Sequence, residues 1–336
     1  MILVLILCAA LWALASVMRA PRWQRWLAVG VVWAVAFVWF RVLLEPGSDN
    51  ARVWVLVTAG AVLVFGYSNL LGRLKRRAQP VVLLGAKPLF EPEELDRYAR
   101  HILLREIGGP GQKAMKQARV LVIGAGGLGS PALMYLAASG VGLIAVMDDD
   151  VVEASNLQRQ IIHETSNIGR DKVASAKAAM LALNPFVEVR AIKARFGADT
   201  DLAGYDLILD GSDNFDTRYL ANRLAAQAGK PLISAAITQW EGQISLYDPA
   251  HGTPCYECVF PNRPAPGMVP TCAEAGVAAP LPGVIGAMMA METVKHLTGA
   301  GEGLKGRLMI YDALYGEVRV IGIKPRVDCA VCGTGR

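Results

Sequence analysis

The hydrophobic residues of this chain follow two different patterns, one near the N-terminus and one in the remainder. The first part contains three apolar stretches with almost no charge, at residues 2–18, 26–40 and 53–71. Beyond residue 119, short apolar runs alternate with longer segments of helical spacing. Short runs rich in Val, Ile and Leu predict strands that are buried on both faces, and their alternation with helices predicts parallel pairing.

The alternating pattern predicts a mostly parallel sheet that is covered by helices on both faces. The predicted parallel strands are residues 120–123, 143–147, 187–192, 206–209 and 231–236, and the predicted helices between them are 131–138, 171–183 and 214–228. After residue 240 the pattern changes. Residues 243–247 are predicted to be an antiparallel strand, and 283–297 a helix packed in the core.

Each of the three N-terminal apolar stretches is close to the length needed to cross a bilayer. Basic residues follow the first stretch, at Arg19, Arg22 and Arg25, and the third, at 73–77. The positive-inside rule then places everything after Gly72 in the cytosol. The expectation is a multi-pass protein of the inner membrane; a cleaved signal peptide or helices buried in a folded domain are the alternatives.

The same pattern divides the chain into three parts. Residues 1–72 are expected to form a three-span anchor, 73–92 a basic linker, and 93–336 a large domain. The hydrophobic fraction of 53% fits this division, because the excess is concentrated at the N-terminus, and the net charge of +5 makes the chain only mildly basic. No Lys/Arg tract with interleaved aromatic residues occurs in the large domain, so nucleic-acid binding is not expected.

A glycine-rich turn joins the first predicted strand to the first helix of the large domain. Gly124, Gly126 and Gly129 satisfy the pattern Gly-x-Gly-x-x-Gly, and Gly127 is an additional glycine. Residues without side chains let backbone N–H groups approach phosphate oxygens at a helix N-terminus. The position between a strand and a helix predicts a nucleotide site, although an ordinary tight turn can have the same sequence.

Polar residues follow the second predicted strand. Asp148 is positioned to accept hydrogen bonds from a ribose, unless it is one of three solvated acids. The next segment contains Asn156 and Arg159, and Lys172 begins a helix. Fixed donors of this kind meet the charge that develops on phosphates during phosphoryl or nucleotidyl transfer. The alternative is that the two basic residues form surface ion pairs.

The segment after the fourth strand offers a candidate metal ligand. Asp213 is a plausible ligand for Mg²⁺, which prefers a carboxylate together with nucleotide phosphates. Asn214 directly precedes a predicted helix. Capping of that helix is the alternative role for this segment, and the two roles are compatible.

The chain has six cysteines, four of which form two Cys-x-x-Cys pairs. Cys255 and Cys258 make one pair, and Cys329 and Cys332 the other. Four thiolates in two such pairs suit a closed tetrahedral Zn²⁺ site, with redox pairs as the alternative. Cys272 is isolated, and either a nucleophile or persulfide carrier or an inert buried side chain fits the sequence equally well.

Taken together, these residues resemble the bacterial ubiquitin-activating-type adenylyltransferases (the MoeB, ThiF and HesA type). This family includes molybdopterin-synthase adenylyltransferase and its thiamine-pathway relative. The resemblance covers about residues 95–333. It rests on the following positions: 97–100, 124–129, 155–160, Lys172, 212–214, 271–272 and both cysteine pairs.

The resemblance implies a reaction, a partner and a fold. ATP adenylylates the C-terminal Gly-Gly carboxylate of a small ubiquitin-fold sulfur-carrier protein, and pyrophosphate is released. The implied fold class is α/β: a Rossmann-like, doubly wound, mostly parallel sheet with an antiparallel, zinc-binding C-terminal part. In this chain three transmembrane helices are expected to precede it and to leave the catalytic domain facing the cytosol.

The resemblance also implies roles for individual residues. Gly127 matches the phosphate loop, Asp148 the ribose contact and Asp213 the magnesium ligand, whereas Asn156, Arg159 and Lys172 match phosphate contacts. Arg100 corresponds to an arginine donated across a homodimer. Two features depart from the family pattern: His101 stands where the family often has Gln, and the apolar N-terminal stretches are additional.

The identity of the carrier is less closely defined. Residues 161–164 and 311–313 look closer to the molybdopterin branch, which makes the small subunit of molybdopterin synthase the favoured partner. The thiamine-pathway carrier is the alternative within the family. Outside it, a membrane-anchored NAD-dependent oxidoreductase would leave Arg159, Lys172 and the cysteine pairs unexplained. Intact Arg159, Lys172 and Asp213 likewise argue against a non-catalytic scaffold for a sulfur carrier.

Overall fold

The computed structural model describes residues 22–42, 89–265, 268 and 272–333, with shorter pieces at 4, 8, 10, 12, 59–60, 62–64 and 66–73. The chain divides into two compact units, Met1–Lys87 and Pro88–Arg336. The second unit contains the sheet and every candidate site residue.

The longest helix of the first unit, α2 (Arg22–Val42), coincides with the second predicted membrane span. Among the described residues, no helix is both long enough and apolar enough to cross a bilayer. The prediction of three transmembrane helices in an inner-membrane protein is therefore wrong for this part of the chain. One physical reason is length, since the uncharged run between Arg25 and Arg41 falls short of the roughly 20 residues that a span requires. Most of the predicted spans 2–18 and 53–71 lies outside the described residues.

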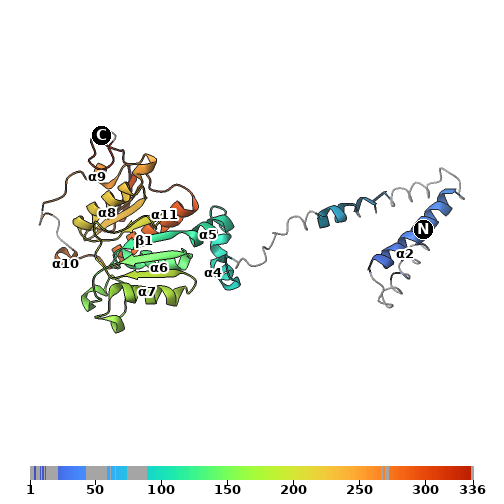
Figure 1. Ribbon diagram of the computed structural model, residues 1–336, viewed down its shortest axis with the longest axis horizontal. Helices are drawn as coiled ribbons and strands as arrows, with labels where there is room; N and C mark the ends of the chain where they lie inside the picture. The colour runs from blue at the N-terminus through green and yellow to red at the C-terminus, as the bar shows by residue number, and fades with distance from the viewer. Residues whose placement is uncertain are drawn as a thin grey trace. The chain divides into compact units, whose positions relative to one another are not determined.

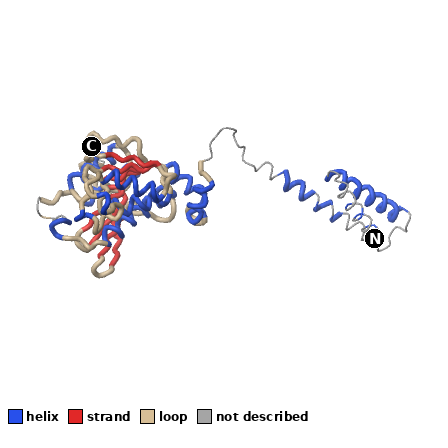
Figure 2. Tube along the Cα trace, turned by 90° about the horizontal axis from the view of Figure 1, so that it is seen from below, coloured by secondary structure: helices blue, strands red, loops and turns tan. Residues whose placement is uncertain are grey.

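The second unit is built on one eight-stranded sheet with the order β3-β2-β1-β4-β5-β6-β7-β8. Figure 2 shows the strands in red and the helices around them in blue. The first five strands are parallel: β1 (Arg119–Ile123), β2 (Leu143–Met147), β3 (Glu188–Ile192), β4 (Leu207–Asp210) and β5 (Leu232–Ile237). The last three are antiparallel: β6 (Glu241–Tyr247), β7 (Arg307–Asp312) and β8 (Glu317–Gly322). The predicted α/β class and the antiparallel C-terminal part are confirmed.

Helices cover both faces of the parallel part (Figure 1). One apolar core lies between the sheet and α6 (Gly129–Ser139), α7 (Lys172–Leu183) and α11 (Pro280–Thr298). A second core lies between the opposite face and α8 (Phe215–Gln227). Alternation along β1 explains both, because Val120 and Val122 belong to the first core while Leu121 and Ile123 belong to the second.

The remaining elements are short. They are α4 (Pro92–Ile102), α5 (Gly108–Gln117), α9 (Tyr256–Val259), α10 (Cys272–Ala275), and the 3₁₀ turns η1 (Ala154–Asn156), η2 (Thr165–Asn167) and η3 (Pro249–His251). In a doubly wound sheet, ligands bind at the carboxyl ends of the strands where the strand order reverses. Here the order reverses between β1 and β4.

Candidate functional site

The glycine loop begins at this reversal point and connects β1 to α6, as predicted. Gly124 has φ +93°, a conformation that a residue with a side chain rarely adopts. A Cβ atom on Gly129 would lie 2.0 Å from the carbonyl oxygen of Gly124. The loop is folded so closely on itself that these two positions require glycine.

Asp148, directly after β2, holds this loop in place. Its Oδ2 accepts the backbone N–H of Ala125 at 2.7 Å, and its Oδ1 accepts the N–H of Asp150 at 2.9 Å. Asp148 is thus bonded to the backbone of the loop and to its own segment. Carboxylate oxygens have further lone pairs, so these bonds leave room for a ribose hydroxyl.

The turn that contains Asn156 and Arg159 lies beside the same loop. A Cβ atom on Gly127 would come within 3.7 Å of Arg159 Cγ, and one on Gly126 within 3.7 Å of Gln160 Nε2. Arg159 donates to the carbonyl oxygen of Ser155 at 3.3 Å, while Asn156 Oδ1 accepts from Gln160 at 2.7 Å. Most of the Arg159 guanidinium donors therefore have no acceptor among the described residues and could meet an anion.

Lys172 is the first residue of α7, and its side chain is buried. The ammonium group pairs with Asp150 Oδ2 at 2.8 Å. An ion pair was the alternative role that the sequence offered for Lys172, and the structure contains one. An ammonium group has three N–H donors, so this pairing leaves two of them for a phosphate.

The segment after β4 contains one structural carboxylate and one exposed carboxylate. Asp210 is fully buried and accepts hydrogen bonds from Ser212, Ser234 and Arg218. Asp213 is exposed and forms no hydrogen bond or ion pair with any described residue. Asn214 Oδ1 accepts the N–H of Thr217 at 2.9 Å and so caps α8. The capping role is confirmed for Asn214, and Asp213 has a carboxylate available for a cation.

A cavity opens beside the carboxyl ends of β2 and β3, next to Asp148. Its volume is about 270 Å³. It is lined by Met147, Ile192, Ala194, Arg195, Asp199, Thr200, Asp201 and Tyr205. Near the glycine loop, two buried polar atoms, Ser130 Oγ and Gln160 Oε1, have no hydrogen-bond partner among the residues that the structure describes.

Two predicted residues are not brought to this site by the described part of the chain. Arg100 is exposed on α4 and has no hydrogen bond or ion pair with another described candidate residue. The neighbouring His101 has a buried Nδ1 atom without a partner. Cys272 begins α10, but its side chain and residues 269–271 lie outside the description.

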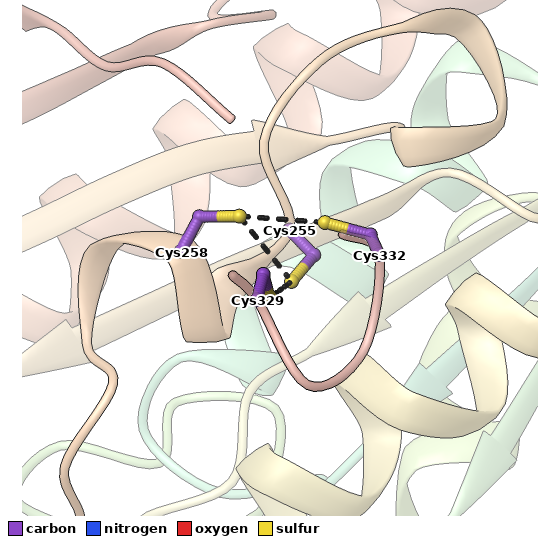
Figure 3. A group of neighbouring side chains, drawn as sticks. All are labelled: Cys255, Cys258, Cys329 and Cys332. Atoms are coloured by element: carbon purple, nitrogen blue, oxygen red, sulfur yellow. Dashed lines mark hydrogen bonds between the residues drawn. The ribbon is translucent and has the colours of Figure 1, made fainter. Parts of the chain in front are cut away.

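The two cysteine pairs meet, although 74 residues separate their members along the chain (Figure 3). The Sγ atoms of Cys255 and Cys258 are 3.9 Å apart, and the contacts between pairs are 3.5 Å for Cys255 and Cys329 and 3.3 Å for Cys258 and Cys332. In a tetrahedral site with Zn–S bonds of about 2.3 Å, the sulfur atoms would be about 3.8 Å apart. The four thiols therefore fit one zinc ion.

The chemistry around the cysteine cluster also fits a metal. Burial raises the pKa of the Cys255 thiol, so a bound cation would be needed to hold it as a thiolate. The backbone N–H of Arg326 donates to Cys258 Sγ at 3.4 Å, as outer groups of metal sites often do. Contacts between pairs as short as those within a pair favour one four-thiol site over two redox pairs.

Three residues that shape the site were not assigned a role from the sequence. His163 contacts Ala125, Gln160 lies beside Gly126, and Arg218 donates to Asp210 and to the carbonyl oxygens of Ser212 and Ala235. Each acts through contacts that are distant in sequence. Local patterns such as glycine spacing contain no signal for them.

Comparisons with known proteins show the family to which this chain belongs. The ThiF family matches residues 98–331. The sulfur carrier protein adenylyltransferase of Thermus thermophilus is 47% identical over 248 residues, which cover 72% of this chain and 92% of that protein. The SAMP-activating enzyme E1 of Haloferax volcanii is also 47% identical, over 73% of this chain and 92% of that protein.

Other relatives are longer or more distant. The probable adenylyltransferase/sulfurtransferase MoeZ of Mycobacterium tuberculosis is 48% identical over 70% of this chain, but the match spans only 64% of that protein. Among solved structures, E. coli MccB with AMPCPP and MccA is 25% identical, with a TM-score of 0.61 over 70% of this chain and 74% of that chain. PaaA, at 23% identity and a TM-score of 0.61 over 85% of this chain and 90% of that chain, supports the fold alone.

Proposed function

Because this chain belongs to the ThiF family, we propose that it is a nucleotidyltransferase that uses ATP to adenylylate a sulfur-carrier protein. The observation that carries the proposal is the position of Arg159 beside Gly127, with the Lys172–Asp150 pair at the same sheet edge. A nucleotide fold alone needs no such pair of cations. A reaction at the α-phosphate does, because negative charge develops on the phosphates in the transition state.

In the proposed reaction, the C-terminal Gly-Gly carboxylate of the carrier attacks the α-phosphate of ATP. The bond to the β-phosphate breaks, so that an acyl-adenylate forms and pyrophosphate leaves. The N–H groups of Gly126 and Gly127 have no acceptor among the described residues and bind the phosphates. Asp148 binds the ribose, and the cavity beside Met147 receives the base.

Cationic groups stabilise the charge on the phosphates. Arg159 and Lys172 do so directly. Asn156 adds a donor when its amide, which donates to Glu153 Oε2 at 3.1 Å and to Ser155 Oγ at 3.2 Å, turns to the phosphates. The exposed carboxylate of Asp213 would hold Mg²⁺, which prefers a carboxylate together with phosphate oxygens and water. When bound, the ion neutralises phosphate charge. Asn214 keeps the end of α8 in place through its cap and so fixes the position of Asp213.

The carrier needs a docking surface on the same side of the sheet as the nucleotide. Every residue of the edge strand β8 is exposed, including Val318, Val320 and Ile321. The hairpin before it begins at Ala313, whose N–H donates to the carbonyl oxygen of Trp240, just beyond the carboxyl end of β5. Exposed apolar edge strands favour pairing with another chain. The hairpin and β8 are therefore the proposed carrier surface.

The small subunit of molybdopterin synthase is the carrier we favour. Residues 161–164 and 311–313 support this choice over the thiamine-pathway carrier. The four cysteines would hold Zn²⁺ as a structural ion, because a closed set of four thiolates leaves no position for a substrate. Cys272 remains a proposed participant in a later sulfur-transfer step, since adenylylation itself needs no thiol.

Pyrophosphate exchange is the direct test of the proposed function. The purified chain is expected to exchange labelled pyrophosphate into ATP only when a carrier ending in Gly-Gly is present. A carrier truncated by these two glycines is the matched control and is expected to support no exchange. Reduction of a substrate with NADH, without adenylate formation, would instead assign the chain to the oxidoreductases.

Arg100 is proposed to act on the nucleotide site of a partner subunit in a homodimer. The Arg100→Ala and Asp213→Ala variants are each expected to be inactive alone. When the two are co-expressed, half of the dimers are mixed, and one of the two sites in each mixed dimer contains both wild-type residues. Activity is therefore expected to return to about a quarter of wild type. If co-purified mixed dimers are inactive, Arg100 does not act across the interface.

A further inference from the structure

His163 is a buried histidine that contacts the glycine loop from a segment 38 residues further along the chain. Its Nε2 lies 2.9 Å from the carbonyl oxygen of Ala125, and its Nδ1 lies 3.0 Å from Ser175 Oγ. The His163 side chain is 7% exposed, and Ser175 is 1% exposed. Neither contact is available to solvent, and no step of the proposed reaction uses the imidazole.

The two contacts define which nitrogen of the ring carries the proton. A carbonyl oxygen can only accept, so Nε2 must be the donor. In the neutral ring Nδ1 then accepts from the hydroxyl of Ser175. Burial of the ring, with a smaller effect from Lys172, lowers the pKa of His163 below its usual value, which favours this neutral form.

Ala125 is consequently held on both sides by side chains. Its N–H donates to Asp148, and its carbonyl oxygen accepts from His163. Ala125 itself is fully buried, while its neighbours Gly126 and Gly127 are partly exposed. Because both backbone polar groups of Ala125 are held, the conformation of the glycine loop is restricted before a ligand binds. Restriction of this kind lowers the entropic cost of binding.

We propose that His163 is a positioning residue for the nucleotide: through the carbonyl oxygen of Ala125 it holds the glycine loop in the conformation that binds the phosphates of ATP. The inference rests on the proposed function in taking ATP as the ligand. The proposed role requires a hydrogen-bond donor at the position of His163 Nε2, directed at the carbonyl oxygen of Ala125. A ring that only fills space in the core would not need that donor.

Asparagine and glutamine distinguish these two roles, because they offer the same amide at different reach. The amide nitrogen of glutamine is as many bonds from Cα as Nε2 of histidine, whereas that of asparagine matches Nδ1. His163→Gln therefore keeps a donor for Ala125, and His163→Asn places its donor near Ser175 instead. His163→Phe keeps the ring and removes both polar atoms.

The experiment titrates Mg-ATP into the full chain by calorimetry and measures KM and kcat in pyrophosphate exchange. His163→Gln is expected to bind ATP within about threefold of wild type, whereas His163→Asn and His163→Phe bind about tenfold or more weakly, as expected for an unpaired buried carbonyl. The loss is expected in KM for ATP, with kcat at saturating ATP within about threefold.

The variants also separate failure of the inference from failure of the proposed function. Equal ATP affinity for the Gln and Asn variants would overturn the role of His163, even if both melt at lower temperature. Wild-type affinity in the Phe variant would overturn it as well. ATP binding in the expected order without any carrier-dependent exchange would contradict the proposed function and leave the role of His163 standing.

Discussion

Replacement of Asp213 by alanine is expected to abolish carrier-dependent pyrophosphate exchange in a chain that remains folded. Asp213 is exposed and has no partner among the described residues, so its removal leaves no unpaired buried group. The metal ion would lose its proposed protein ligand, and the phosphates would keep charge that the ion neutralises. The exchange assay and a melting curve together measure both parts of this prediction.

A matched control lies in the first turn of the next helix. Asp216 is also exposed, and it pairs with Arg263 on the surface. Asp216→Ala removes the same charge without touching the proposed metal site, and exchange is expected to stay within about twofold, because surface pairs contribute little. Full exchange by the Asp213→Ala variant would refute the assignment of the metal ligand.

Replacement of Arg159 is expected to reduce pyrophosphate exchange less than replacement of Asp213 does. Arg159→Ala is expected to reduce exchange on the order of 100-fold, the usual size of the loss when one transition-state donor is removed. Arg170 is exposed and its side chain donates to the nearby Asn167, so Arg170→Ala is the control. Equal activity in the two variants would show that Arg159 does not contact the reacting phosphate.

Loss of the metal is the second large effect that we expect. One Zn²⁺ per chain is expected on metal analysis, and both chelation and Cys255→Ser should unfold the second unit at moderate temperature. Structural zinc can contribute roughly 10–16 kcal/mol to folding, whereas a domain is stable by only about 5–15 kcal/mol. Because the contribution of zinc is comparable to the whole stability of a domain, removing the ion is expected to unfold the second unit.

Cys8 provides the control for this experiment. It is a cysteine in the first unit, outside the cluster, so Cys8→Ser is expected to leave metal content and melting unchanged. The measurements are zinc per chain by elemental analysis and thermal melting before and after chelation. A metal-free chain with an unchanged melting temperature would contradict the structural role of the cluster.

The parallel strands β1, β2, β4 and β5 were predictable because both of their faces are buried, whereas the edge strand β3 is mostly exposed. Residues such as Val120, Leu121 and Val122 must all be apolar, and that requirement leaves a continuous run in the sequence. β8 gave no such signal, since all six of its residues are exposed and its position depends on pairing with β7. When an edge strand is held mainly by backbone hydrogen bonds, the types of residue in it are only weakly constrained.

Within the part of the chain that the structure describes, the prediction of transmembrane helices failed for a related reason. The apolar composition between residues 2 and 71 indicates that side chains are buried. Composition alone does not say whether lipid or protein covers them. The charges at Arg25 and Arg41 limit the uncharged run within α2 to residues 26–40. Within α2, the length of the uncharged run was therefore a better guide than the overall hydrophobicity of the region.

By itself, the sequence determined those features that depend on neighbours in the chain or on shared strand ends. The glycine loop is local, and Asp148 and Asp213 follow strands whose carboxyl ends must meet at one edge of the sheet. Tertiary structure alone decided which partner each group takes. It brought Cys255 to within 3.5 Å of Cys329 and placed His163 on Ala125. The physical reason is that hydrogen bonds and metal ligands depend on distances between atoms, and residues far apart in sequence approach only when the core packs.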